Sequence, residues 1–348
     1  LKWETTTEWN LGLDMGFLNN RILASVEFYH KVVSDLLNYK PLNAYQEITR
    51  VMANVGKTQS TGVELTINTK NIDSRNFKWS TDFTFTAYKD RWKERTPDWK
   101  PGVYERVDDP IRPIYTRLAD HILQIGEQVP DAQPLLRPGE LVIKDINGYR
   151  RDANKQPIVD ENGRFVLTGE PDGLIDDADN VLLGSQDPSW LAGITNTFKY
   201  KDFDLNIQLN GMFGRRMQDP TEMAYGLGGG DLARYGYNAL RKIKDRWTWD
   251  NPSTTQPTSF NGWGNNYTSG DWYYQRAWFI RLTNISFGWT LPKAWIARTK
   301  VLSRVRLSLS ANNLFCITPY KGLDPETDYY AASYPNARTY SMGINVTF

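Results

Sequence analysis

Apolar and polar residues alternate with a period of two along much of this 348-residue chain. That period is typical of a β-strand whose two faces meet different surroundings. The end of the chain shows it most clearly. Apart from an arginine at its start, one face there carries only apolar side chains: Arg338, Tyr340, Met342, Ile344, Val346 and Phe348. The other face carries Thr339, Ser341, Gly343, Asn345 and Thr347.

Similar alternation in other segments predicts about nine strands in all. The other segments are 9–17, 20–38, 60–71, 77–88, 189–200, 202–213, 277–291 and 304–312. Most are longer than the roughly six residues that are usual for strands in soluble proteins. Arg, Asp and Asn occur deep inside the polar faces, as a water-filled lumen allows. The pattern therefore predicts an all-β fold, a transmembrane antiparallel β-barrel. The alternative is a soluble antiparallel sandwich, which also alternates.

The connections between these segments alternate between short and long. The short ones are 18–20, 72–76, 201–202 and 292–302, and the long ones lie near 39–59, 89–188, 214–276 and 316–336. Outer-membrane barrels place short turns in the periplasm and long loops outside the cell. We therefore expect a protein of the outer membrane of a Gram-negative bacterium, with extracellular long loops and a periplasmic C-terminus.

The predicted orientation also bears on the start of the chain. Counting back from a periplasmic C-terminus, the first strand runs inward, so Leu1 is expected at or near the cell surface. Single-chain bacterial barrels have an even number of strands, and an open strand edge in lipid leaves backbone groups unpaired. We expect residues 1–348 to be the C-terminal part of one barrel domain, with its plug and N-terminal strands lying outside this sequence.

Composition agrees with this class and disfavours others. No stretch approaches the roughly 18 apolar residues of a membrane-spanning helix, yet 13 Trp and 19 Tyr suit two aromatic girdles. A net charge of +1 gives no reason to expect nucleic acid as a partner. The chain has two histidines and one cysteine, and acidic pairs such as Asp176-Asp177 fall in loops. These residues form no recognisable catalytic constellation, so we do not expect an enzyme.

Several motifs resemble the C-terminal barrel region of SusC-like TonB-dependent transporters. They are Trp3-Glu4-Thr5-Thr6, Asn54-Val55-Gly56, Gly62-Val63-Glu64-Leu65, Ile175-Asp176-Asp177, Leu183-Gly184, Phe203-Asp204-Leu205, Phe279-Ile280-Arg281-Leu282, Asn284-Ile285, Ala311-Asn312-Asn313-Leu314-Phe315, Tyr320-Lys321-Gly322-Leu323-Asp324-Pro325-Glu326 and Tyr334-Pro335. Each motif is weak alone, and together they are specific to that family.

This resemblance implies a barrel of about 22 strands closed by an N-terminal plug. It also implies a SusD-like surface lipoprotein as a lid, TonB as the source of energy, and a dimer of transporter–lid pairs. The implied cargo is an oligosaccharide or a peptide, and the sequence leaves that choice open. Two alternatives remain: a siderophore- or cobalamin-type receptor of the same architecture, and a surface glycan-binding or adhesion protein.

The closing strand also carries a candidate signal for assembly into the outer membrane. Its terminal aromatic residue follows apolar residues at every second position, and the set is Tyr340, Met342, Ile344, Val346 and Phe348. Such a strand is suited to pair edge-on with an assembly machine before the barrel closes.

One segment resembles a calcium-binding loop, in which oxygen ligands recur at fixed spacing around a glycine. Its two halves, 145–148 and 172–179, are separated by about 23 inserted residues. If the halves meet, the candidate ligands are Asp145, Asn147, Asp172, the Leu174 carbonyl, Asp176 and Asp179. We expect Ca²⁺ rather than Mg²⁺, with the role of ordering the 89–188 surface loop. A solvated acidic turn is the alternative.

Aromatic residues gather in the 214–276 loop, where they are candidates for contact with substrate. Flat rings beside polar groups stack on sugars or hold apolar side chains of a peptide. The candidates are Trp263, Tyr267, Trp272, Tyr273 and Tyr274. Packing against a lid protein and membership of the upper aromatic girdle are the alternatives.

Overall fold

The computed structural model describes residues 1–42, 50–96, 102–161, 164–226, 236, 238–258, 270–327 and 334–348. Its main feature is one antiparallel sheet in which each long strand pairs with the next long strand along the chain. These strands are β1 (Thr5–Phe17), β2 (Ile22–Ser34), β5 (Lys57–Asp73), β6 (Phe77–Glu94), β11 (Trp190–Tyr200), β12 (Phe203–Phe213), β15 (Phe279–Thr290), β16 (Arg304–Asn312) and β18 (Thr339–Thr347). The short strand β17 (Cys316–Ile317) pairs with β15. The predicted set of about nine strands is confirmed.

The register of the sheet brings like residues together across its strands. From β6 to β18, one row of neighbouring residues runs Trp79, Phe198, Leu205, Phe287, Leu309 and Met342. A second row, on the opposite face, runs Asp82, Thr195, Gln208, Asn284, Asn312 and Thr339 over the same strands. A shift of one residue in any pairing would mix the two faces. The alternation read from the sequence is therefore continuous in space.

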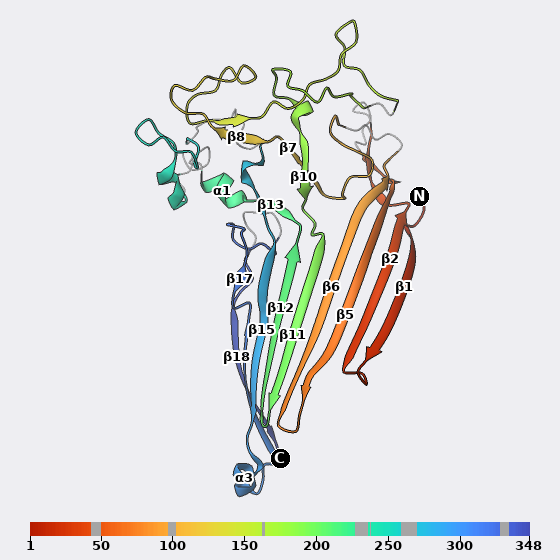
Figure 1. Ribbon diagram of the computed structural model, residues 1–348, viewed down its shortest axis with the longest axis vertical. Helices are drawn as coiled ribbons and strands as arrows, with labels where there is room; N and C mark the ends of the chain where they lie inside the picture. The colour runs from red at the N-terminus through yellow and green to blue at the C-terminus, as the bar shows by residue number, and fades with distance from the viewer. Residues whose placement is uncertain are drawn as a thin grey trace.

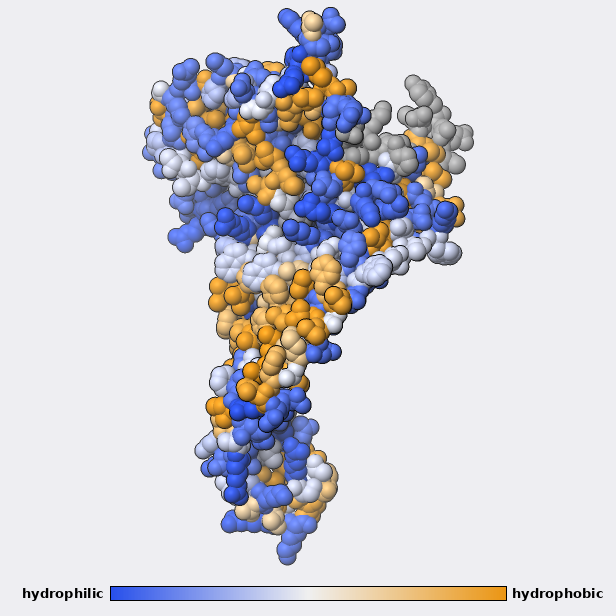
Figure 2. All heavy atoms as spheres, turned by 45° about the vertical axis from the view of Figure 1, so that its right-hand side comes forward, coloured by the Kyte–Doolittle hydropathy of each residue, from blue (hydrophilic) through white to orange (hydrophobic). Residues whose placement is uncertain are grey.

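The apolar face is exposed even in strands that have a neighbour on both sides. Phe28 of β2 is 47% exposed, Phe287 of β15 is 41% exposed and Leu309 of β16 is 53% exposed. Figure 2 shows apolar residues gathered across the sheet between a hydrophilic loop region above and a hydrophilic lower end. A soluble sandwich buries such a face against a second sheet. The exposed apolar face fits the wall of a membrane barrel.

Long and short connections lie at opposite ends of the sheet (Figure 1). The lower end carries the turns 18–21, 74–76 and 201–202 and the 291–303 connection, which contains α3 (Lys293–Ile296) and η5 (Ala297–Thr299). The C-terminus lies at this end and the N-terminus at the upper end, where the long connections are (Figure 1). The predicted alternation of connection lengths is confirmed.

The long connections contain short elements that alternation did not reveal. Small hairpins and single turns of helix lie there: β3 (Leu37–Pro41), β4 (Arg50–Asn54), β7 (Pro113–Thr116), β8 (Ala119–Ile122), β9 (Leu141–Ile143), η1 (Asp177–Asp179), β10 (Val181–Ser185), β13 (Arg216–Gln218), α1 (Pro220–Tyr225), η2 (Arg241–Asp245), η4 (Asp271–Tyr273) and β14 (Tyr274–Arg276). Several pair segments far apart in sequence, such as β7 with β10. None of the described helices is long and apolar enough to cross a membrane.

The two faces of β12 give a direct test of the sheet's surroundings. Ile207 belongs to the apolar face and its neighbour Gln208 to the polar face. Ile207→Arg should reduce the amount of folded protein in the outer membrane, because arginine on the lipid face near the midplane costs about 2–4 kcal/mol. Gln208→Arg is the matched control and should leave that amount nearly unchanged. Heat-modifiability on gels measures the folded fraction; equal effects of the two changes would contradict this assignment of faces.

Candidate functional site

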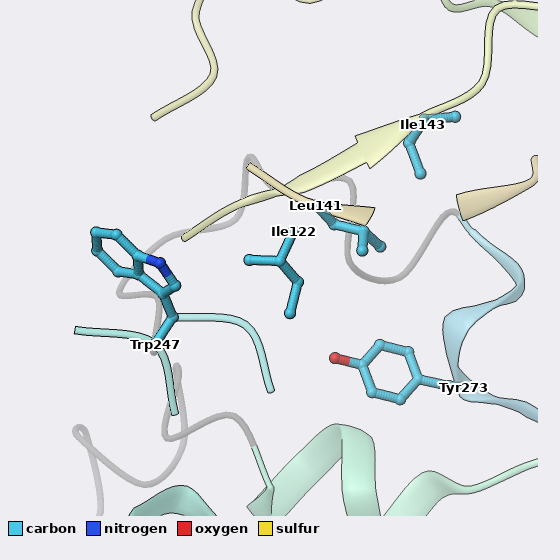
Figure 3. Packing of buried hydrophobic residues seen from close by; sticks show 5 residues of the cluster. All are labelled: Ile122, Leu141, Ile143, Trp247 and Tyr273. Atoms are coloured by element: carbon cyan, nitrogen blue, oxygen red, sulfur yellow. The ribbon is translucent and has the colours of Figure 1, made fainter. Parts of the chain in front are cut away.

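The upper connections pack on one another around a small apolar core (Figure 3). Its buried members are Ile122 from β8, Leu141 and Ile143 from β9, Trp247 after η2, and Tyr273 from η4. The first three belong to the connection between β6 and β11, and the last two to the connection between β12 and β15. The indole nitrogen of Trp247 also donates to Oε1 of Gln124, at 3.2 Å. This core joins the two longest connections into one layer above the sheet.

The two halves of the calcium-like loop meet in this layer. The inserted residues between them turn back on themselves, with bridges that pair Tyr149 with Leu167 and Val159 with Phe165. The return brings Asp172 directly against Gly148, where an added Cβ would lie 2.5 Å from the Cβ of Asp172. Only glycine fits at that contact. The insertion therefore leaves the halves adjacent, although they are far apart in sequence.

Backbone N–H groups are the partners of the candidate acidic ligands in this loop. Asp145 accepts from the N–H groups of Asp172 (3.2 Å) and Gly173 (2.7 Å), which ties one half to the other. Asp179 is fully buried and accepts from Ile146 (2.8 Å), Asn147 (3.2 Å) and Asp176 (2.9 Å). These backbone hydrogen bonds hold the two halves of the loop together.

The other candidate ligands have similar local roles. Oδ1 of Asn147 accepts from Gly169, Oδ1 of Asp172 from Leu174, and Oδ1 of Asp176 from Ala178. Within the described ranges, no three His, Cys, Asp or Glu side chains converge as metal ligands. The two halves thus meet in the structure, and Ca²⁺ binding stays a prediction.

The predicted aromatic contacts divide into three cases. Trp263 and Tyr267 lie outside the described residues. Tyr273 is 1% exposed and belongs to the apolar core, so we assign it a packing role instead of substrate contact. Trp272 packs against the same core while partly exposed, and Tyr274 begins β14, which pairs with β13. For Trp272 and Tyr274, contact with substrate stays a prediction.

A buried ion pair fixes the last long connection to the sheet, and sequence reasoning missed it. Arg281 lies on the polar face of β15, and its Nη2 is 2.6 Å from Oδ1 of Asp324; both side chains are about 5% exposed or less. Asp324 also accepts from the N–H groups of Glu326 and Asn336, at 2.9 and 3.0 Å. Nε of Arg281 is 3.0 Å from Oε2 of Glu326. Arg281 and Asp324 both belong to motifs that resemble SusC-like transporters. The spacing of those motifs did not predict that the two side chains form an ion pair.

A second charged cluster lies at the outer side of the loop layer. His121 lies between Oδ2 of Asp120 (2.9 Å) and Oε1 of Glu127 (2.6 Å). Partial burial disfavours the charged ring, but the hydrogen bonds to Asp120 and Glu127 outweigh it and raise the pKa of His121. The pKa of Glu127 is lowered, first by the N–H of Gln124 and then by His121. Each charge in the cluster thus stabilises its neighbour.

Aromatic residues form two belts on the apolar face. The upper belt stacks Trp190 on Phe213 and Phe213 on Trp278, and the lower belt stacks Phe203 on Phe287 and Trp289. Along β11, ten residues separate Trp190 from Tyr200 at the lower end, which is about 33 Å of extended strand. With the tilt of strands in barrels this becomes about 25 Å, the height of the apolar band of outer-membrane barrels.

Comparison with known proteins shows which receptors this chain is similar to. The model of the TonB dependent receptor-like β-barrel matches residues 1–119. TonB-dependent receptor P3 of Formosa agariphila is 29% identical over 100% of this chain and 34% of its own length. TonB-dependent receptor SusC of Bacteroides thetaiotaomicron is 27% identical over 100% of this chain and 32% of its own. Over its whole length the chain is thus similar to SusC-like TonB-dependent receptors.

Solved structures agree on the fold of this SusC-like chain. The RagAB peptide transporter matches with a TM-score of 0.77 at 22% identity, covering 100% of this chain and 36% of the other. The open-open state of the RagAB peptide importer gives a TM-score of 0.73. The SusC-like chain spans about a third of the length of the relatives that it matches.

The proposed assembly residues lie together on the last strand of this SusC-like chain. Tyr340, Met342, Ile344 and Val346 share the apolar face of β18, where they neighbour residues of β16. They are exposed by 72%, 76%, 58% and 43%, and the terminal Phe348 by 81%. Their role as an assembly signal stays a prediction.

Asp179 provides a test of how the acidic loop is held. Asp179→Asn puts an amide NH₂ where an oxygen accepts N–H groups, and a buried N–H without a partner costs about 1–3 kcal/mol. Segment 145–179 should then exchange its amide hydrogens faster, as measured by mass spectrometry on the detergent-solubilised protein. Asp177→Asn, whose side chain is 65% exposed, is the control and should leave exchange unchanged. Equal exchange in both variants would exclude a structural role for Asp179.

Proposed function

We propose that this chain forms part of the wall of a TonB-dependent importer in the outer membrane, and that the cargo is an oligosaccharide or a peptide. The observation that carries the proposal is the two-faced sheet. An apolar face of about membrane height and a continuous polar face suit lipid on one side and a hydrated passage on the other. The match to SusC-like receptors along the whole chain supports the same function.

The polar face suits cargo that forms many hydrogen bonds. Asn284 donates to Asn312 at 2.7 Å, and Asn312 donates to Thr339 at 3.0 Å, so amides line successive strands. Asn68 donates to Asp82 at 2.7 Å further along the sheet. Neutral amides and hydroxyls offer donors and acceptors to sugar hydroxyls and to peptide bonds alike. This wall therefore gives no preference between the two cargo classes.

We further propose that the loop layer faces the cell exterior, with the short turns and the C-terminus in the periplasm. The resemblance to SusC-like receptors supports a SusD-like lipoprotein as the partner of that layer, TonB as the energy source, and an assembly of two transporter–lid pairs. The core between the two longest connections would give such a lid a preformed surface, because Trp247, Tyr273 and their neighbours already fix those connections.

The test is to isolate the protein from native outer membranes in detergent and to identify all co-purifying molecules by mass spectrometry. We expect a SusD-like lipoprotein and bound peptides or oligosaccharides. Uptake of the identified cargo by cells should stop when TonB is deleted. A protein that stays soluble and alone without detergent would contradict the barrel, and uptake that continues without TonB would contradict the energy source.

We also propose that the acidic loop binds Ca²⁺, because Asp145 and Asp172 approach each other from its two halves. Calorimetric titration with CaCl₂ should show binding to the wild type, and binding should weaken at least about tenfold in Asp172→Asn, because Ca²⁺ affinity depends on the number of charged ligands. Asp177→Asn is the control, since Asp177 is not a proposed ligand. No binding heat in the wild type at millimolar Ca²⁺ would leave the loop as a self-sufficient acidic turn.

A further inference from the structure

Both ring nitrogens of His121 in β8 face carboxylate oxygens. Nδ1 is 2.9 Å from Oδ2 of Asp120, and Nε2 is 2.6 Å from Oε1 of Glu127. A neutral imidazole has one N–H and one lone pair, so it can donate to only one of the two carboxylates. The doubly protonated ring donates to both. The geometry around His121 is therefore that of the charged imidazolium.

The charges around the ring balance only when the ring is protonated. Asp120 of β8, Glu127 of the turn that follows β8, and Lys144 after β9 are the described charged groups in contact with the ring or with its carboxylate partners. Nζ of Lys144 is 3.2 Å from Oδ1 of Asp120. With His121 charged, two positive groups face two negative ones. Loss of the proton leaves one negative charge in excess and turns a ring lone pair toward a carboxylate oxygen.

The sign of the pH dependence follows from this environment. Partial burial disfavours the charged ring, but the hydrogen bonds to Asp120 and Glu127 outweigh it and raise the pKa of His121 above its usual value of about 6.5. A group whose pKa is higher in the folded than in the unfolded state stabilises the fold while it is protonated. The stabilisation is fully present below about pH 6.5 and is lost as the pH rises through the higher pKa of the folded state.

The carboxylate of Glu127 connects the ring to the turn that follows β8. While Oε1 faces His121, Oε2 accepts from the backbone N–H of Gln124 at 2.9 Å. The N–H of Glu127 in turn donates to the carbonyl oxygen of Gln124 at 3.3 Å. The carboxylate that faces the ring therefore also holds Gln124 in place.

The side chain of Gln124 joins the two longest connections. Its Nε2 donates to the carbonyl oxygens of Ile122 and Ser253, at 2.6 and 3.2 Å, and its Oε1 accepts from the indole nitrogen of Trp247 at 3.2 Å. Ser253 and Trp247 lie between β12 and β15, whereas Gln124 lies between β6 and β11. Ile122 and Trp247 also belong to the apolar core of the loop layer (Figure 3). A continuous series of contacts thus runs from the imidazole to the second connection.

We propose that His121 is a pH-sensitive link between the two longest connections. While the ring is protonated, it fixes Glu127, and Glu127 fixes Gln124 against the second connection. When the ring loses its proton, it keeps only one of its two carboxylate contacts, and the turn 124–127 and the segment 246–256 loosen together. The proposal concerns the loop layer alone and does not rest on the proposed function, so each can fail without the other.

Amide hydrogen exchange tests the link on the detergent-solubilised protein, by mass spectrometry between about pH 5 and pH 9, which spans the titration of histidine. Exchange rates are divided by those of unfolded reference peptides at each pH, which gives a protection factor. Protection of segments 119–127 and 246–256 should fall together about threefold as the pH rises, in keeping with the small energy of exposed ion pairs. Constant protection, or a fall confined to 119–127, would overturn the proposal.

Two substitutions of His121 abolish its titration in opposite ways. His121→Arg is charged at every pH and has several donors, so protection should stay high throughout. His121→Gln is never charged, so protection should stay low throughout. The matched control is His30→Gln, because His30 is the other histidine of the chain and contacts Thr61 of the sheet at 2.7 Å. This control should keep the wild-type pH dependence; if both His121 variants kept it as well, the proposal would be wrong.

Glu127→Gln tests the carboxylate separately. It removes one of the two negative charges that favour the protonated ring, so the pH at which protection falls should shift downward by about half a unit. Asp131→Asn removes an exposed carboxylate further along the same connection and should leave that pH unchanged. An unshifted transition in Glu127→Gln would mean that a group other than His121 titrates, and it would contradict the proposed link.

Discussion

The constraint on which the structure depends is that strands in lipid must satisfy every backbone N–H and C=O group through their neighbours. The antiparallel ladder from β1 to β18 meets this constraint for the strands between its two edges. The ladder fixes the register, and the register collects apolar residues on one face and polar residues on the other. The two unlike faces and the position of the connections both follow from that arrangement. A single slipped pairing would bring charged and amide side chains into lipid.

The two ends of the sheet are stabilised in different ways. At the lower end the connections are short, and a cross-strand ion pair over Gly288 keeps charged side chains in order. At the upper end the connections are long and need cores of their own. They obtain them from Trp247 and Tyr273 packing on β8 and β9, from the buried Arg281–Asp324 pair, and from the carboxylate of Asp179. A buried ion pair is costly to break, because the remaining charge is left unpaired. The described parts of the loop layer therefore have packing and buried polar contacts of their own.

For several residues that stood out in the sequence, the tertiary contacts indicate a role or position that the sequence did not predict. The sequence places Tyr273 among candidates for substrate contact, yet its side chain is buried in the core of the loop layer. The acidic loop was interrupted by an insertion, yet its halves meet because the insertion folds back as a hairpin. Lys293 and Arg304 carried no motif, yet α3 and β16 place both of them at the border of the same hollow.

The sequence by itself determined the strands, their order, the two faces and the alternation of short and long connections. Those features depend on a period of two and on neighbouring segments, which are local properties of the chain. The tertiary structure decided which loop residues meet: Asp145 with Asp172, Arg281 with Asp324, and Asp204 with Arg306. These pairs join residues separated by long stretches of chain. Their geometry depends on how whole connections fold back, and no local pattern encodes it.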